Sequence, residues 1–142
     1  MNKTINGFTL IEMLFTMVIL SLLIFIGVPS LIKVIENQQT KHFFQILNSD
    51  IFYIQNQALG TRQNIRIMFD EDYYILLHEQ KAEEIKRFYP EHLTYKLDIN
   101  NRISFSNSGT VINPTTFMFT DNNHSYKIVF PLGKGRHYIE KQ

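Results

Sequence analysis

The hydrophobic pattern is dominated by an apolar segment near the start of the chain. From Phe8 to Ile32 this segment has a single ionisable side chain, that of Glu12. At a rise of 1.5 Å per residue, a helix from Phe8 to Val28 spans roughly 30 Å, which matches the hydrocarbon core of a bilayer. The segment therefore predicts a membrane-spanning helix.

Beyond Pro29 the pattern stays helical but becomes amphipathic. Apolar residues recur at spacings of three, four or seven, which is typical of one helix face. They are Ile32, Ile35, Phe43, Ile46, Leu47, Ile51, Ile54 and Ala58. We expect this face to pack on a sheet, because the stripe is too short for a convincing coiled coil and core packing is commoner than a pocket. Gly27 and Pro29 predict a curved or kinked helix, and Gly60 predicts its end.

After Gly60 the pattern changes to short runs rich in Ile, Tyr and Phe, which favour β-strands. Turn residues separate several of the runs, as at Asp70–Asp72, Asp121–Asn123 and Gly133–Gly135. The strands are expected at 64–69, 73–79, 85–89, 93–97, 103–106, 116–120, 125–132 and 136–140. Together they predict an α+β fold, in which a long N-terminal helix continues into a helix packed on an antiparallel β-sheet.

Composition excludes several classes of chemistry. The chain has no Cys, which rules out disulfides, thiolate metal sites and thiol catalysis. The formal net charge of +1 gives no argument for a nucleic-acid partner or an anionic membrane. A chain that is 44% hydrophobic, with 12 Phe and 7 Tyr, is expected to fold.

A short polar leader, Met1–Gly7, precedes the apolar segment. The far end of the segment lacks the small-residue cleavage site of a secretory signal, whereas Gly7 has no side chain to obstruct a protease. A cut after Gly7 leaves the apolar helix on the mature protein. We therefore expect a leader at 1–7, a transmembrane and assembly helix at 8–32, and a soluble domain at 33–142 whose helix runs to about residue 59.

Glu12 needs a reason to lie in an apolar segment, because an ionised carboxylate in hydrocarbon costs about 3 kcal/mol on insertion scales. One explanation is an ion pair. A cut after Gly7 creates a protonated α-amine on Phe8, and helix packing between subunits would bring that amine to the Glu12 carboxylate of a neighbour. The alternative is that Glu12 reaches the membrane interface and favours the positive end of the helix dipole.

The run from Gly7 to Met13 resembles the processing motif of type IV pilins and pseudopilins. The resemblance implies that a prepilin peptidase cuts between Gly7 and Phe8, methylates the new amine of Phe8, and leaves Glu12 to guide the subunit into a filament. It also implies a pilin-like fold, a leader in the cytoplasm, and three partners: other pilin-like subunits, the peptidase and the cytoplasmic membrane. After assembly the filament is expected at the cell surface.

Two later runs, Ile103–Thr110 and Leu132–Arg136, resemble minor pseudopilins of the competence apparatus through which some Gram-positive bacteria take up DNA. Minor pseudopilins of type II secretion share these features but usually have longer chains. A second hypothesis is a DNA-binding subunit at the filament tip. In that case Lys134, Arg136 and Lys141 would contact phosphates, with Tyr126 or Tyr138 stacking on bases. The competence role does not require such contact, so DNA is expected as an indirect partner.

No cofactor, metal or catalytic site is expected. The five His residues lack the paired spacing of metal ligands, and Gly133–Gly135 lacks the remaining residues of a phosphate-binding loop. Asp70–Asp72 is expected to be a solvated turn, because no calcium-loop spacing follows it. A membrane-tethered enzyme is a third hypothesis, and the missing catalytic constellation disfavours it.

Overall fold

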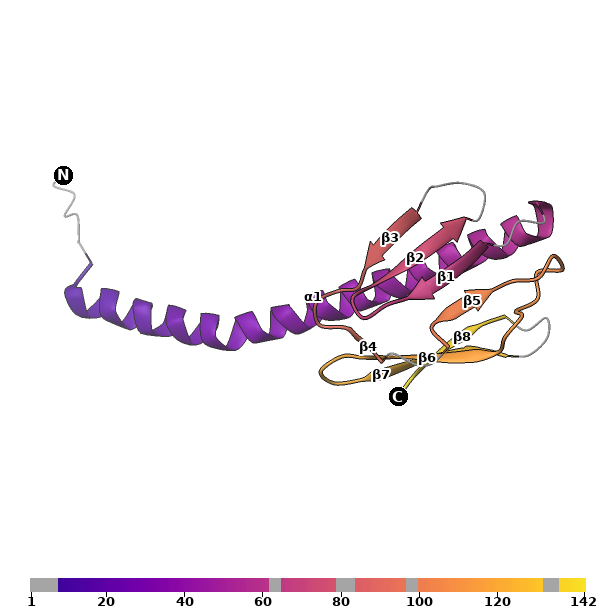
Figure 1. Ribbon diagram of the computed structural model, residues 1–142. Coiled ribbons are helices and arrows are strands. Elements are labelled where there is room, and N and C mark those ends of the chain that lie inside the picture. Colours follow the sequence, from indigo (N-terminus) through magenta and orange to yellow (C-terminus); the bar gives the residue numbers. More distant parts are fainter. Residues whose placement is uncertain (1–7, 62–64, 79–83, 97–99, 132–135) are drawn as a thin grey trace. The chain divides into compact units, whose positions relative to one another are not determined.

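A computed structural model describes residues 8–61, 65–78, 84–96, 100–131 and 136–142 of the chain. These residues form one long helix, α1 (Leu10–Thr61), followed by eight strands (Figure 1). The chain divides into two compact units, Met1–Gln38 and Gln39–Gln142. The division falls within α1, so each half of the helix is described with its own unit.

Helix α1 is continuous in both units. Its helical residues continue through Gly27 and Pro29, so the proline does not end the helix. The end at Thr61 lies one residue beyond the expected Gly60.

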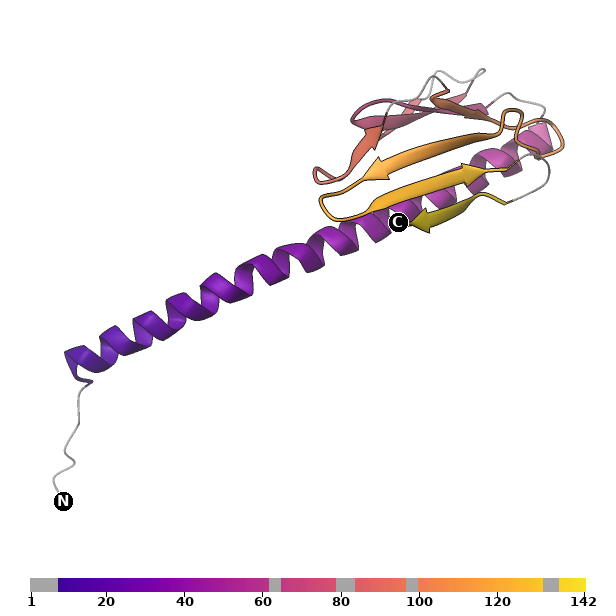
Figure 2. The ribbon, with the colours of Figure 1, turned by 90° about the horizontal axis from the view of Figure 1, so that it is seen from below.

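All eight expected strands are present, with ends within two residues of those predicted. They are β1 (Ile65–Phe69), β2 (Tyr73–His78), β3 (Glu84–Phe88), β4 (Thr94–Lys96), β5 (Arg102–Ser104), β6 (Thr115–Thr120), β7 (Ser125–Phe130) and β8 (Tyr138–Lys141). The expected α+β architecture with antiparallel pairing is confirmed, but the strands form two four-stranded sheets, β3-β2-β1-β5 and β4-β6-β7-β8. Figure 2 shows β6, β7 and β8, coloured orange to yellow, side by side. Local patterns mark each strand, whereas long-range packing decides that β4 and β5 join different sheets.

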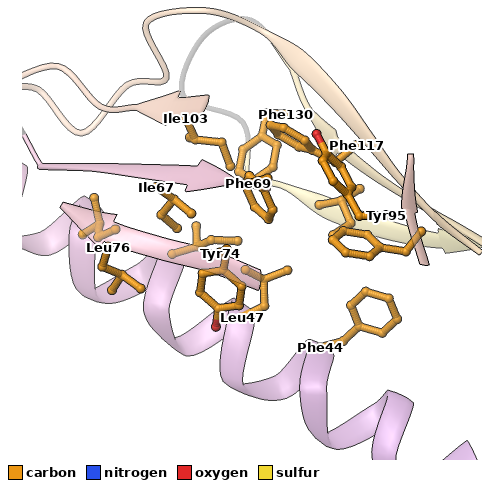
Figure 3. Packing of buried hydrophobic residues seen from close by; sticks show 14 of the residues in the cluster. Phe44, Leu47, Ile67, Phe69, Tyr74, Leu76, Tyr95, Ile103, Phe117 and Phe130 are labelled. Carbon is orange, nitrogen blue, oxygen red and sulfur yellow. The ribbon is translucent and has the colours of Figure 1, made fainter. Parts of the chain in front are cut away.

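The core of the second unit lies between its half of α1 and the inner faces of the two sheets (Figure 3). The helix contributes Leu47, Ile51, Ile54 and Ala58, each no more than 1% exposed. Aromatic rings join the sheets, with the ring centroids of Phe69 and Phe117 lying 4.4 Å apart. The predicted stripe is thus confirmed at Phe43, Leu47, Ile51, Ile54 and Ala58. Ile46 is only partly buried, and Ile32 and Ile35 are exposed and lie in the other unit.

One buried carboxylate fixes α1 to the first sheet. Asp50 is 8% exposed and its Oδ2 accepts hydrogen bonds from the Tyr74 hydroxyl at 2.6 Å and from Arg87 Nε at 2.6 Å. Burial and the bond to Asp50 raise the pKa of Tyr74 well above its usual range, so this hydroxyl stays a donor at neutral pH. Because the contact joins α1 to both β2 and β3, it orients the helix on the sheet.

The run Ile103–Thr110, which carries part of the resemblance, contains the end of β5 and a tight turn against α1. Gly109 donates its N–H to the Ser106 carbonyl at 2.8 Å and has a positive φ of 71°. Its own carbonyl accepts a hydrogen bond from Gln55 Nε2 of α1 at 2.8 Å. A Cβ at this position would lie 3.1 Å from the Leu59 side chain. The turn therefore needs glycine for its backbone and for its close approach to the helix.

Replacing Gly109 by Ala should lower the free energy of unfolding by about 1–2 kcal/mol, because an L-residue pays a steric penalty at positive φ. Urea denaturation of a fragment comprising residues 33–142 measures the change. Ser108→Ala, in the same exposed turn, should change stability by no more than about 0.5 kcal/mol. Equal effects of the two substitutions would contradict the assigned turn geometry.

We expect residues 33–142 to form a soluble, folded protein, because the buried cluster uses only residues of the second unit. Circular dichroism should show helix and sheet together, and unfolding should be cooperative. The full chain serves as the comparison and should require detergent. A disordered fragment would show that the first unit is needed for folding.

Candidate functional site

The start of α1 is fixed by a cap at Thr9. The N–H of Glu12 donates to the Thr9 carbonyl at 3.1 Å and lies 3.4 Å from its Oγ1, while the N–H of Met13 donates to the same carbonyl at 3.2 Å. A threonine hydroxyl that accepts from the first turn stabilises a helix N-terminus. The helix therefore begins at Leu10, and Phe8 lies outside it.

Thr9 is a residue that the sequence analysis overlooked. Thr9 and Glu12 have the Thr-x-x-Glu spacing of a capping box, so the signal was present in the sequence. Glu12 lies in the first turn of α1, where a carboxylate is favoured by the positive end of the helix dipole. This placement supports the interfacial explanation of Glu12 in the isolated chain and leaves its pairing role open.

The predicted scissile bond lies at the edge of the described residues. Gly7 lies outside them, and Phe8 is 73% exposed. Phe8 and Glu12 belong to one short segment on either side of the helix start. An amine created on Phe8 would thus sit beside the first turn that carries the acid.

Apolar side chains cover the first half of α1 on all sides. Every large apolar residue from Phe8 to Ile35 is exposed, with fractions between 47% at Val28 and 81% at Leu10. The helix is long and apolar enough to cross a membrane by length and composition. Together with its place near the N-terminus, this exposure fits membrane anchoring.

The hydroxyls within the apolar half are bonded inside the helix. Thr16 Oγ1 donates to the Met13 carbonyl at 2.9 Å, and Ser21 Oγ donates to the Met17 carbonyl at 2.6 Å. In hydrocarbon no water is present to bond polar groups, so such groups need hydrogen bonds within the protein. Glu12 cannot be satisfied in this way as a charge, which makes it the chemically distinctive residue of the segment.

The structure describes two of the three basic residues considered for contact with nucleic acid. Arg136 is exposed just before β8, Lys141 ends β8, and Lys134 lies outside the described residues. In the pairing of β7 with β8, Glu140 lies directly opposite Lys127, so the acid offsets a neighbouring cation.

Of the two tyrosines considered for base stacking, only Tyr138 is accessible. Tyr126 is 7% exposed, and its hydroxyl donates to Asp121 Oδ2 at 3.1 Å. Its ring is therefore part of the core, whereas Tyr138 is 47% exposed on the edge strand β8.

Two of the histidines and the acidic turn Asp70–Asp72 make contacts within the fold. His92 Nε2 lies 2.8 Å from Thr40 Oγ1, and the ring of His137 stacks on Phe130 at 5.3 Å, where burial lowers the pKa of His137. The backbone N–H of Glu71 donates to Asp70, which lowers the pKa of Asp70 in a solvated turn. Among the described residues, no three His, Asp or Glu side chains are grouped as metal ligands.

Residues 2–28 match the family model described as the prokaryotic N-terminal methylation motif. The match includes Gly7, Phe8 and Glu12 and stops one residue before Pro29. Comparisons with curated proteins and with solved structures found no match. The chain therefore carries the N-terminal methylation motif of prokaryotic prepilin-type proteins, followed by a pilin-like α+β architecture.

Proposed function

We propose that the chain is a structural, non-enzymatic minor pseudopilin of a competence filament, of the ComGD class. The observation that carries the proposal is the methylation motif over residues 2–28, set directly on an apolar helix whose side chains are exposed all round. A filament subunit needs both features, because the motif directs processing and the apolar helix anchors the chain before assembly. The proposed location is the cytoplasmic membrane of a Gram-positive bacterium and, after assembly, the cell surface.

In this proposal the prepilin peptidase cuts between Gly7 and Phe8 and methylates the new amine of Phe8. The cap at Thr9 supports this site, because it starts the helix at Leu10 and leaves Phe8 outside. A protease needs a backbone that is free of helical hydrogen bonds, and Phe8 lies outside the helix.

Glu12 then acts in assembly by pairing with the Phe8 amine of a neighbouring subunit. Methylation of a primary amine leaves a basic secondary amine, so the positive charge is kept. Within a bundle of apolar helices this pair satisfies two charges that would each be costly alone. Other pilin-like subunits are therefore the principal partners.

The competence role rests on the resemblance of the runs Ile103–Thr110 and Leu132–Arg136, the first of which contains the glycine turn on α1. A minor pseudopilin of type II secretion is the alternative within the same class. Loss of the chain should abolish uptake of transforming DNA and leave protein secretion intact. The reverse phenotype would assign the subunit to secretion.

A DNA-binding tip subunit is the second functional alternative. Arg136 and Lys141 are exposed, but Glu140 lies between them in sequence, opposite Lys127. We therefore propose DNA as an indirect partner only.

Substitution of Gly7 by Val should block processing, because the peptidase must approach the backbone at that position. The unprocessed chain keeps the leader Met1–Gly7 and should migrate more slowly on a denaturing gel. Asn6→Ala, one residue earlier, is the matched control and should be processed normally. Normal maturation of Gly7→Val would contradict the assigned scissile bond.

Glu12→Ala should still insert and still be processed, but it should fail to enter filaments. Insertion becomes easier by about 3 kcal/mol, because no charge has to leave water. In the filament, however, a Phe8 amine would lack its counter-charge, and a buried ion that loses its partner costs about 3–5 kcal/mol.

Glu12→Gln separates charge from shape, because it keeps the side-chain length and removes the ion. Thr16→Ala, one turn later in the same helix, is the matched control and should assemble normally. Immunoblots of isolated filament fractions provide the measurement. Wild-type incorporation of both Glu12 variants would leave the acid with its interfacial role alone.

A further inference from the structure

Each sheet of the second unit ends in an edge strand with a free outer side. The orders β3-β2-β1-β5 and β4-β6-β7-β8 end in β3 and β8, so no described strand pairs with the outer sides of these two. The opposite edges, β5 and β4, have three residues each, whereas β3 has five and β8 has four. Strands β3 and β8 are therefore the longer described edges, and a free edge presents backbone groups that can pair with another strand.

The inward side chains at both edges are incompletely covered. Ile85 on β3 lies opposite the fully buried Leu76 and therefore faces the core. In the same way, Ile139 on β8 lies opposite the fully buried Ile128. Ile85 is nevertheless 40% exposed and Ile139 is 37% exposed. One more strand beside each edge would complete the burial of both side chains.

Backbone hydrogen bonds show which groups of β3 point to its free side. The N–H of Tyr89 donates to the carbonyl of Asp72 at 2.9 Å, so these residues form a hydrogen-bonded pair at the ends of β3 and β2. Hydrogen-bonded pairs alternate along an antiparallel ladder. Lys86 is one of the alternate residues, together with Glu84 and Phe88, so its N–H and carbonyl point away from β2.

The same alternation identifies the free groups of β8. Gln142 and Ser125 exchange two hydrogen bonds, at 2.8 and 3.3 Å, and so form a hydrogen-bonded pair. The next residue of β8 that bonds to β7 is therefore Glu140. Ile139 and Lys141, on either side of Glu140, direct their N–H and carbonyl groups to the free side of β8.

We propose that β3 of one copy of this chain pairs in parallel with β8 of a second copy. Figures 1 and 2 show that β3 and β8 each run opposite to α1, so a parallel pair keeps the second-unit half of α1 pointing the same way in both copies. In a parallel pair, the two backbone groups of one residue bond to the residues on either side of its opposite number. The free groups of the two edges thus permit Lys86 to lie opposite Glu140, bonded to Ile139 and Lys141.

The side chains favour this register. On the inner face Ile85 lies beside Ile139, so each covers the exposed part of the other. On the outer face the exposed Lys86 lies beside the exposed Glu140, and opposite charges on neighbouring strands attract. A shift by two residues would separate both pairs.

The other neighbours in this register are compatible with it. The carboxylate of Glu84 can accept a hydrogen bond from the hydroxyl of Tyr138. The one pair of like charges is Arg87 beside Lys141, and its cost is reduced because Arg87 Nε already donates to Asp50 Oδ2 at 2.6 Å.

The contact joins two different surfaces of the same chain. After β3 of one copy has paired with β8 of the next, each copy keeps one free edge, so the contact repeats and builds an open helical array or a ring. A filament subunit needs a repeating contact of this kind. The inference therefore rests on the proposed function and adds a contact between the sheets to the one between the apolar helices.

Cysteine pairs test the contact in the full chain, which has no cysteine of its own. One tagged copy carries Glu84→Cys, and a differently tagged copy in the same membranes carries Tyr138→Cys. Neighbouring strands lie about 4.8 Å apart, within the range of Cα separations for a disulfide, so mild oxidation should link the two copies. Either variant alone should give roughly tenfold less dimer, because only one edge then carries a cysteine.

Thr94→Cys in place of Glu84→Cys is the matched control, because Thr94 is an exposed position on another edge strand, β4. A chain with both Glu84→Cys and Tyr138→Cys should form a ladder of oligomers. Loss of the leader is read on the same gel, so failed pairing is distinguished from failed processing. No dimer from the mixture, equal dimer from the single variants or the control, or linkage at Arg136→Cys in place of Tyr138→Cys overturns the proposal.

Charge reversal tests the register. In the cysteine pair, Lys86→Glu in the first copy or Glu140→Lys in the second places like charges side by side and should reduce the dimer roughly fivefold, equivalent to about 1 kcal/mol. The two reversals together should restore it. If these charges only kept other strands away from the edges, reversal of one would not reduce the dimer. A dimer that is insensitive to either reversal, or that the combination does not restore, contradicts the proposed pairing.

Discussion

Apolar side chains cover the whole circumference of the first half of α1, and the rest of the molecule is organised around that constraint. Burying one large apolar side chain is worth about 1.5–3 kcal/mol, so a surface of this size must be covered by lipid or by other subunits. The second half of the same helix meets a different requirement, because one of its faces is buried in the core that it forms with the two sheets. The buried contact of Asp50 with Tyr74 and Arg87 fixes that second packing.

The first half of α1 has two environments, the membrane before processing and the proposed filament after it. Glu12 is the residue whose partner differs between the two. The Thr9 cap and the helix dipole stabilise its first-turn position in the chain before processing. In the proposed filament, the new amine of Phe8 replaces water as the partner of this carboxylate. Under this proposal the same acid is tolerated during insertion and gains a specific partner only when a processed neighbour is present, which would link cleavage to assembly.

Local patterns predicted most elements of this fold, because helix and strand periodicities depend only on residues that are close together in the sequence. The helix end near Gly60 and the turn at Asp121–Asn123 are examples. Periodicity could not predict that β4 and β5 belong to different sheets, because strand pairing depends on residues distant in sequence. The same holds for the contact of Asp50 with Tyr74 and Arg87. The exposure of Ile32 and Ile35 was missed because an amphipathic spacing does not say where a core begins. The Thr9 cap could have been predicted from its spacing to Glu12.

The central claim is that the apolar helix belongs to a processed filament subunit and not to an uncut membrane anchor. Mass spectrometry of the N-terminal peptide from membrane-extracted protein tests it most directly. The account predicts a mature chain that begins at Phe8 and carries one added methyl group on its α-amine. A chain that retains the leader through Gly7, or one cut beyond the apolar segment, would contradict it.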